Sequence, residues 1–238
     1  MKSDFNYHGD VVVFDLDDTL FRERDFVRSG FRLIAARIAA IYNVDASRLP
    51  ELLNCALCRR ERYFDLLEDW MAEHGLPRED VAGLVEAYRS HVSEDLSLAP
   101  EAAMLLQTLA DRGVVLGIVT DGRSVTQRSK ILALGLDRYV DPENILISEE
   151  TGKDKSRPDN FRHFVNRYPE ARRFFYIADN ERKDFLIPNL LGWTSVKAPY
   201  DPDNVQEDYV ASDKMSQPAF ILSSLSDFLT EFLPSGGR

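Results

Sequence analysis

The apolar residues of this chain form short runs separated by segments with helical spacing. The first run, residues 11–14, is continuously apolar and rich in β-branched residues, as expected for a strand buried on both faces of a parallel sheet. Similar short runs occur at residues 114–120, 144–148, 173–178, 193–198 and 219–222. Because helical segments alternate with these runs, the pattern predicts an α/β protein with a mainly parallel sheet.

This strand rhythm stops between Phe21 and Leu98, where the spacing of apolar residues becomes helical. One apolar stripe consists of Val27, Phe31, Ile34, Ile38 and Ile41. Three further helices are predicted near residues 49–58, 60–74 and 78–92. We therefore predict a four-helix insertion, residues 22–97, in a core made of residues 1–21 and 98–238. Because the insertion directly follows the first strand, we expect it above the carboxyl ends of the sheet, where ligands of open α/β sheets bind.

Charge and composition narrow the class of partner. The net charge of −11, from 40 acidic and 29 basic residues, argues against broad binding to nucleic acid or to anionic lipid, but not against binding of a phosphorylated metabolite. No apolar run is long enough to cross a bilayer and the N-terminus is polar, so we expect a cytoplasmic monomer or homodimer with no membrane partner. Cys55 and Cys58 lack a second Cys or His pair, which favours a helical surface over a zinc site.

Three carboxylates, Asp15, Asp17 and Asp18, follow the first strand. An acidic cluster at the carboxyl end of a parallel strand can bind a divalent cation, accept a phosphoryl group or move a proton. If the chain stays extended, Asp15 and Asp17 point to the same side, whereas Asp18 points elsewhere and bonds the loop backbone. Taken alone, the motif could also be an acidic turn that caps a helix.

Chemically suitable residues follow the other predicted strands as well. Thr120 precedes a glycine turn that opens a helix, which is an arrangement suited to binding an anion. Lys153 and Lys155 follow the third strand, and Asp179 and Asp184 follow the fourth. Because the carboxyl ends of parallel strands share one edge, these residues predict a site for magnesium and phosphate.

The order of these motifs resembles the haloacid dehalogenase-like hydrolase superfamily, specifically the phosphatases whose helical cap is inserted after the first motif. "DLDDTLF" is similar to the first motif, "VTDGR" to the second, and "DNERKDF" to the fourth. Lys155, Pro158 and Phe161 have the spacing of the third motif. The resemblance implies a doubly wound, Rossmann-like core with a four-helix cap.

Three positions depart from the usual motifs of the family, and the motif lysine has a rival. Ser156 replaces the proline that follows the motif lysine, Ala178 replaces the glycine before Asp179, and Glu181 stands where proline is common. Lys153 is a rival for the motif lysine, although the spacing to Phe161 favours Lys155.

The resemblance implies a magnesium-dependent hydrolysis in two steps. Asp15 attacks phosphorus to form an aspartyl-phosphate, and Asp17 acts first as acid and then as base. Magnesium is expected to bind the carboxylates of Asp15 and Asp179 and the backbone carbonyl of Asp17, while Asp184 orients this shell. Catalysis is thus assigned to Asp15, Asp17, Thr120 and Lys155.

The phosphate oxygens are expected to bind Thr120, the backbone N–H of Asp121 and Lys155. A capped cleft favours a small phosphate monoester, with sugar phosphates and nucleoside monophosphates equally open. The candidate substrate contacts in the cap are Phe21, Arg22, Arg59, Arg60 and Arg62, although arginines on a helix are more often solvated.

Alternative functions stay open at this point. Halide-displacing dehalogenases lack the acid two residues after the nucleophile, so Asp17 argues against that activity. A phosphosugar mutase keeps both acids, and a second substrate hydroxyl takes the place of water. A non-catalytic phospho-acceptor or phosphometabolite-binding module is the alternative of a different class. The long insertion argues against a receiver domain, and the presence of Asp15 and Asp17 argues against a degenerate binding module.

Overall fold

A parallel sheet forms the centre of the protein in the computed structural model, which describes residues 9–232. The strands lie in the order β3-β2-β1-β4-β5-β6, and all five neighbouring pairs are parallel. Their bounds are β1 Asp10–Phe14, β2 Val115–Thr120, β3 Ile145–Ile147, β4 Arg173–Ala178, β5 Thr194–Lys197 and β6 Phe220–Ile221. This is the strand order of a doubly wound sheet, so the predicted fold class is confirmed.

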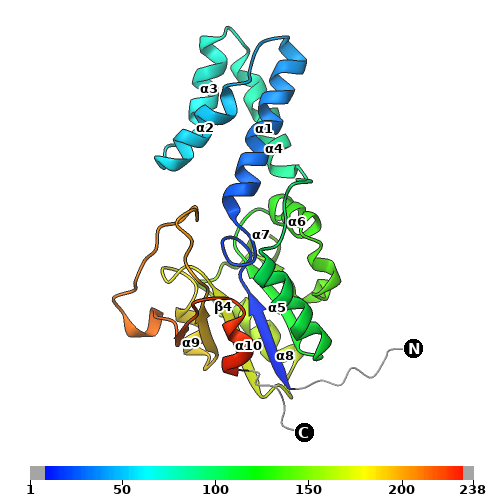
Figure 1. Cartoon of the computed structure of the whole chain (residues 1–238), viewed down its shortest axis with the longest axis vertical. Coiled ribbons are helices and arrows are strands. Elements are labelled where there is room, and N and C mark those ends of the chain that lie inside the picture. The colour runs from blue at the N-terminus through cyan, green and yellow to red at the C-terminus, as the bar shows by residue number, and fades with distance from the viewer. Residues whose placement is uncertain (1–8, 233–238) are drawn as a thin grey trace, which may run out of the picture.

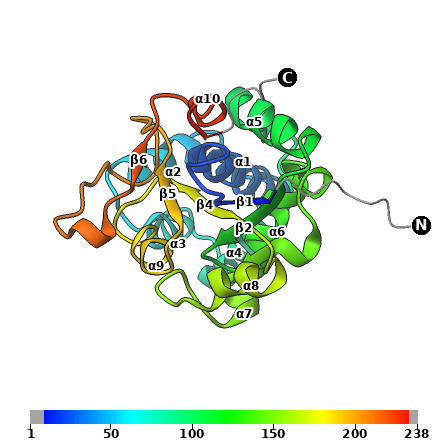
Figure 2. The same cartoon turned by 90° about the horizontal axis from the view of Figure 1, so that it is seen from below.

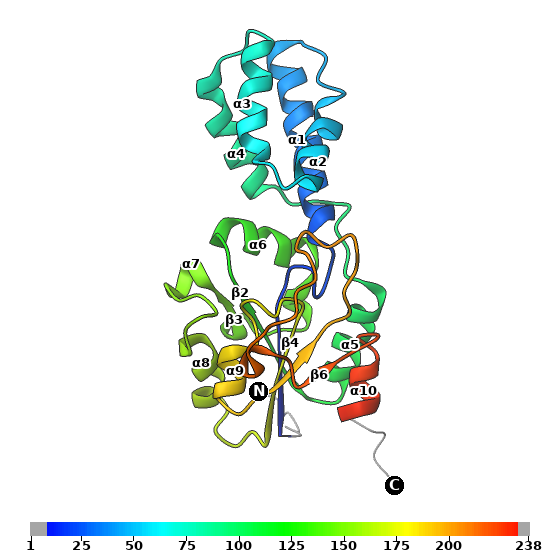
Figure 3. The ribbon, with the colours of Figure 1, turned by 90° about the vertical axis from the view of Figure 1, so that its left-hand side faces the viewer.

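Strand β1 is buried on both faces, as its apolar sequence predicts. Val12 and Phe14 enter one hydrophobic cluster and Val11 and Val13 enter another, all with no exposed surface. On one face of the sheet, α5 (Pro100–Asp111) and α10 (Asp227–Phe232) cover the first cluster. On the other face, α8 (Asp159–Arg167) and α9 (Leu186–Leu190) cover the second (Figures 2 and 3). Burial of each such side chain contributes about 1.5–3 kcal/mol, so the strand that carries Asp15 is firmly held.

The first four helices form a separate helical body above the carboxyl edge of the sheet (Figures 1 and 3). They are α1 Glu23–Tyr42, α2 Leu49–Cys58, α3 Tyr63–Glu73 and α4 Val81–Ser90. α3 begins later than residue 60 because Arg60 has a positive φ of 60° and belongs to the turn after α2. Cys55 and Cys58 are free and exposed on α2, as predicted. No helix within residues 9–232 is long and apolar enough to cross a membrane.

One member of the predicted apolar stripe on α1 is wrong. Val27, Phe31, Ile34 and Ile38 are buried, but the side chain of Ile41 is 62% exposed. At 100° per residue, Ile41 falls at the margin of the stripe, and it lies in the last turn of the helix. Helical spacing alone therefore extended the buried face too far, into the last turn of α1.

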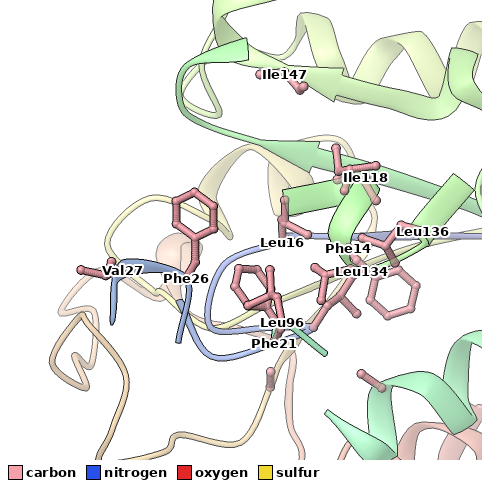
Figure 4. Packing of buried hydrophobic residues seen from close by; sticks show 14 of the residues in the cluster. Phe14, Leu16, Phe21, Phe26, Val27, Leu96, Ile118, Leu134, Leu136 and Ile147 are labelled. Atoms are coloured by element: carbon pink, nitrogen blue, oxygen red, sulfur yellow. The ribbon is translucent and has the colours of Figure 1, made fainter. Parts of the chain in front are cut away.

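The linkers between sheet and helices pack into a continuous hydrophobic cluster. Leu16, Phe21 and Phe26 extend the buried residues of β1 toward the first helix of the insertion (Figure 4). The two linkers also pair with each other, because the N–H of Ala99 donates to the carbonyl of Leu20 at 3.0 Å. The helical body is thus joined to the core by packed, hydrogen-bonded segments.

Tyr88 on α4 is the centre of an aromatic group inside the helical body. Its ring contacts those of Phe26, Phe31 and Phe64, and it covers the Cα of Gly30 on α1. A Cβ added at Gly30 would lie 2.3 Å from a ring carbon of Tyr88, which is closer than any van der Waals contact. Glycine is therefore required at this crossing of α1 and α4.

We expect Gly30→Ala to destabilise the protein, and Gly83→Ala to provide the matched control. Both glycines are helical, but a Cβ at Gly83 meets nothing within 4 Å. Alanine at Gly83 should therefore raise the free energy of unfolding by up to about 1 kcal/mol. Overpacking at Gly30 should lower it by about 1–3 kcal/mol. Urea unfolding followed by circular dichroism measures both. Equal stability of the two variants would contradict the close packing of α1 on α4.

Candidate active site

The site lies where the strand order of the sheet reverses. Asp15 follows β1 at the centre of the sheet, Thr120 ends β2 on one side, and Asp179 follows β4 on the other. The N–H of Asp15 donates to the carbonyl of Ile177 at 2.9 Å, which continues the β1–β4 pairing up to the acid. The fold therefore brings these three predicted residues to the crevice where doubly wound sheets bind ligands.

Lys155 is a buried cation at this edge of the sheet. Its side chain is fully buried, with Nζ 2.6 Å from Asp15 Oδ1 and 2.8 Å from Asp184 Oδ1. The second oxygen of Asp184 accepts the N–H of Asn180 at 3.1 Å, which holds this acid in place. Lys153, the rival in the sequence, is exposed, and its carbonyl accepts the side-chain amide of Asn160 at 2.9 Å.

The surroundings of Asp15 favour its ionised form. Burial by itself opposes ionisation, but the charges of Lys155 and Lys183, with a hydrogen bond from Lys155, outweigh it and lower the pKa of Asp15. The N–H of Leu16 also donates to Asp15 Oδ1 at 2.7 Å. A carboxylate that stays ionised is the form required of a nucleophile.

Three acids meet at this point. Carboxylate oxygens of Asp15, Asp179 and Asp184 lie within 4.8 Å of one another. Burial, followed by the charges of Asp15 and Asp184, raises the pKa of Asp179 to about 8. A set of crowded carboxylate oxygens is the donor chemistry that magnesium takes, and the bound ion would relieve this repulsion, so the residues present fit the metal.

Asp17 does not share the cation of Asp15. Its Oδ1 lies 2.6 Å from Nζ of Lys130, and its Oδ2 accepts the side-chain amide of Gln127 at 2.9 Å. The same amide nitrogen donates to Oγ1 of Thr120 at 2.6 Å. Within residues 9–232, the carboxylate of Asp17 is not part of the three-acid cluster, and the resemblance assigns only its backbone carbonyl to the metal.

Sequence reasoning missed Gln127, Lys130 and Glu23. Lys130 is buried on α6 (Ser124–Ala133), and its Nζ also lies 3.4 Å from Glu23 at the start of α1. Burial, and then the charge of Asp17, raises the pKa of Glu23 to about 7. The sequence offered one signal for two of them. Gln127 and Lys130 are three residues apart on the helix after Thr120, so both side chains lie on one face of that helix.

Asp18 has the structural role expected from the sequence. It has a positive φ of 52°, and its carboxylate accepts the N–H of Glu23 at 2.9 Å and that of Val205 at 2.8 Å. Burial raises its pKa to about 6, against these two hydrogen bonds. Asp18 thus joins the start of the first helix to the loop after β5.

The predicted arginines of the insertion have acidic partners elsewhere. Arg22 pairs with Asp201 at 2.6 Å and Arg60 with Glu207 at 3.0 Å, both on the loop after β5. Arg59 and Arg62 pair with neighbouring acids of their own segment, Glu61 at 3.9 Å and Asp65 at 3.3 Å. In the described part of the chain, the ion pairs of these arginines are therefore not with Asp15 or Asp179.

Phe21 and Asp121 have contacts that the sequence did not predict. Phe21 is buried in the hydrophobic cluster of the linkers, and together with Arg22 it lines a cavity of about 750 Å³ between the linkers and the loop after β5. Asp15 and Lys155 do not line this cavity. The side chain of Asp121 accepts the backbone N–H of Lys155 at 3.1 Å, so Asp121 fixes the loop that carries the lysine.

Known proteins are similar to this chain in sequence and in fold. The chain is 30% identical over 195 residues to the glyceraldehyde 3-phosphate phosphatase of Methanopyrus kandleri, a match that covers 79% of this chain and 82% of that protein. It is 28% identical over 218 residues to the ribulose-1,5-bisphosphate 5-phosphatase of Halopiger xanaduensis, with 86% and 90% covered. The crystal structure of a HAD phosphatase from Thermococcus onnurineus covers 93% of this chain and 96% of its own, with a TM-score of 0.58 and 19% identity.

The motifs and the sheet edge described above lie within a single family match. The family model of the haloacid dehalogenase-like hydrolases matches residues 10–186, which include the first strand, the helical insertion and all four motifs. Because this match spans most of the chain, it agrees with the resemblance predicted from the motifs. The protein belongs to the haloacid dehalogenase-like hydrolases.

Proposed function

We propose that the protein is a magnesium-dependent phosphatase that hydrolyses a small phosphate monoester through an aspartyl-phosphate on Asp15. The observation that carries this proposal is the buried group of Asp15, Lys155 and Asp184, with Asp179 beside it. The names of the relatives add support, because both are phosphatases of small phosphorylated sugars. A sugar phosphate is therefore the substrate class that we favour over a nucleoside monophosphate.

In the first step, a carboxylate oxygen of Asp15 attacks phosphorus and the bond to the leaving oxygen breaks. Asp17 donates a proton to that leaving oxygen. Thr120 is suited to bind the transferring group, because its oxygen accepts from Gln127 and its own hydrogen stays available to a phosphate oxygen. Lys155 and the N–H of Asp121 are the other proposed donors.

In the second step, water attacks phosphorus of the aspartyl-phosphate. Asp17 removes a proton from this water, inorganic phosphate leaves, and Asp15 returns to its carboxylate form. Lys155, held by Asp184, stays next to Asp15 through both steps. Because this lysine is fully buried, its charge acts in a region that water screens poorly.

Magnesium, bound by Asp15 and Asp179 and by the backbone carbonyl of Asp17, would supply positive charge that offsets the repulsion between the nucleophile and the phosphate. The helical body, residues 22–97, is proposed as the cap that excludes water from the cleft. The cytoplasm is the compartment that fits this substrate class. The mutase and the binding module remain as outcomes of the test below.

We expect the wild type to release inorganic phosphate from at least one member of a panel of triose, pentose and nucleoside phosphates with magnesium. Asp15→Asn should abolish this release, because the amide keeps the shape of the side chain but is a poor nucleophile. Malachite green measures the phosphate, and circular dichroism checks the fold. Activity of the variant within about tenfold of wild type would remove Asp15 as the nucleophile.

The same panel separates the alternatives. A mutase would give an isomeric sugar phosphate without stoichiometric inorganic phosphate, which ³¹P NMR distinguishes. Binding of the compounds with no product of either kind would indicate a binding module.

We also expect magnesium alone to raise the melting temperature of the wild type. The bound ion should relieve the repulsion among Asp15, Asp179 and Asp184, and binding to the folded state stabilises by mass action. Asp179→Asn should weaken this shift, whereas Asp137→Asn, a substitution of an exposed acid outside the cluster, should not. Differential scanning fluorimetry with increasing magnesium measures the shift. An equal shift in Asp179→Asn would contradict this metal site.

Because Lys155 is buried and Lys153 is exposed, we expect the two lysines to differ in their contribution to kcat/KM. Lys155→Ala should lower kcat/KM at least about a hundredfold, or about 2.7 kcal/mol, because a charge-assisted contact to the nucleophile and the phosphate is lost. Lys153→Ala should cost less than about tenfold, since that side chain is exposed. Steady-state kinetics and a melting curve for each variant provide the comparison. An exchange of the two effects would assign the role to Lys153.

A further inference from the structure

The side chain of Asp17 is fixed at both of its oxygens. Lys130 Nζ binds Oδ1 and the amide of Gln127 donates to Oδ2, so the carboxylate cannot rotate without breaking a contact. Both donors come from α6, the helix that starts just after Thr120. The same amide nitrogen of Gln127 also donates to Oγ1 of Thr120 at 2.6 Å, so one side chain contacts both Asp17 and Thr120. The position of Asp17 is therefore tied to that of the proposed phosphate-binding hydroxyl.

Lys130 is held by the segment that leads into the helical body. Its side chain is 3% exposed, and its Nζ lies 4.9 Å from the ring centroid of Phe26 and 5.8 Å from that of Phe21. The carboxylate of Glu23, in the first turn of α1, lies on the same ammonium group. Aromatic faces and acids that surround a buried cation restrict where it can lie. The ammonium group is thus a fixed point against which Asp17 is placed.

A purely structural role does not account for this arrangement. Burying a lysine with two carboxylates carries a desolvation cost, and replacing such groups with apolar residues is often neutral or stabilising. The network instead connects residues that act on different atoms of the proposed reaction, namely Asp17 on the leaving oxygen and Thr120 on the phosphate. Distances between such groups must be kept to a fraction of an ångström for efficient proton transfer.

We propose that Lys130 is a positioning residue, which holds the carboxyl group of Asp17 at the leaving oxygen of the substrate and acts only through Asp17. The inference rests on the proposed function. In this proposal, residues of α6 align Asp17 with the hydroxyl of Thr120. The rate of proton transfer then depends on Lys130, which does not touch the substrate.

The test compares substrates whose leaving groups need a proton to different degrees. The leaving group of p-nitrophenyl phosphate is p-nitrophenolate, a stable anion, whereas the leaving oxygen of a sugar phosphate requires protonation. Lys130→Met should lower kcat/KM on the active sugar phosphate by at least about fivefold more than on p-nitrophenyl phosphate. Arg128→Met is the matched control on the same helix, because Arg128 pairs with Glu150 at 2.6 Å, and it should leave this ratio unchanged. Lys130→Gln is a second variant that keeps a polar side chain if the methionine variant does not fold.

A double-mutant cycle then separates positioning from independent catalysis. If Lys130 acts through Asp17, adding Lys130→Met to Asp17→Asn should not change the substrate ratio further. The inference would be overturned if the ratio of kcat/KM on the two substrates is unchanged in both Lys130 variants, or if the effects of Lys130→Met and Asp17→Asn on it are additive. In that case, turnover by the wild type would still support the proposed function. Absence of turnover in the wild type would reject the proposed function and this inference with it.

Discussion

The mutual repulsion of buried carboxylates is the constraint on which the rest of this structure depends. Asp15 and Asp184, both buried, meet the partly buried Asp179 at the centre of a sheet edge, where water screens their charges poorly. The protein offsets part of this charge with Lys155, which is buried between Asp15 and Asp184. It separates Asp17 from that group by giving it a second buried cation, Lys130. Two acids that are two residues apart in the chain are thereby placed in different electrostatic surroundings.

Much of the fold was predictable because local patterns carry it. The apolar run of β1, the shorter runs of the later strands and the turn residues between them predicted a parallel sheet, and the acids at its carboxyl edge followed from strand polarity. Phe161, the apolar residue of the third motif, is fully buried. Ile41 shows the limit of periodicity, because the end of an amphipathic face depends on what packs against it.

The contacts around the acids were not predictable for a different reason. Lys130 meets Asp17 across 113 residues of sequence, and Val205 meets Asp18 across 187. Nothing in the spacing of a basic residue on a helix specifies which acid it will contact. The loop after β5 is a similar case, since its ion pairs with Arg22 and Arg60 depend on how distant segments are folded together. The buried pair of Lys197, at the end of β5, with Glu181, after β4, depends on this too.

The hydrogen bond between Ala99 and Leu20 has a consequence for how such proteins diversify. The chain leaves the core and returns to it at the same place, so the helices between these points form a loop whose two ends are already held together. Insertions with adjacent ends can be lengthened, shortened or exchanged without moving the strands that carry them. The helical segment can therefore be exchanged as a unit, while the strands that carry Asp15 and Asp179 keep their places in the sheet.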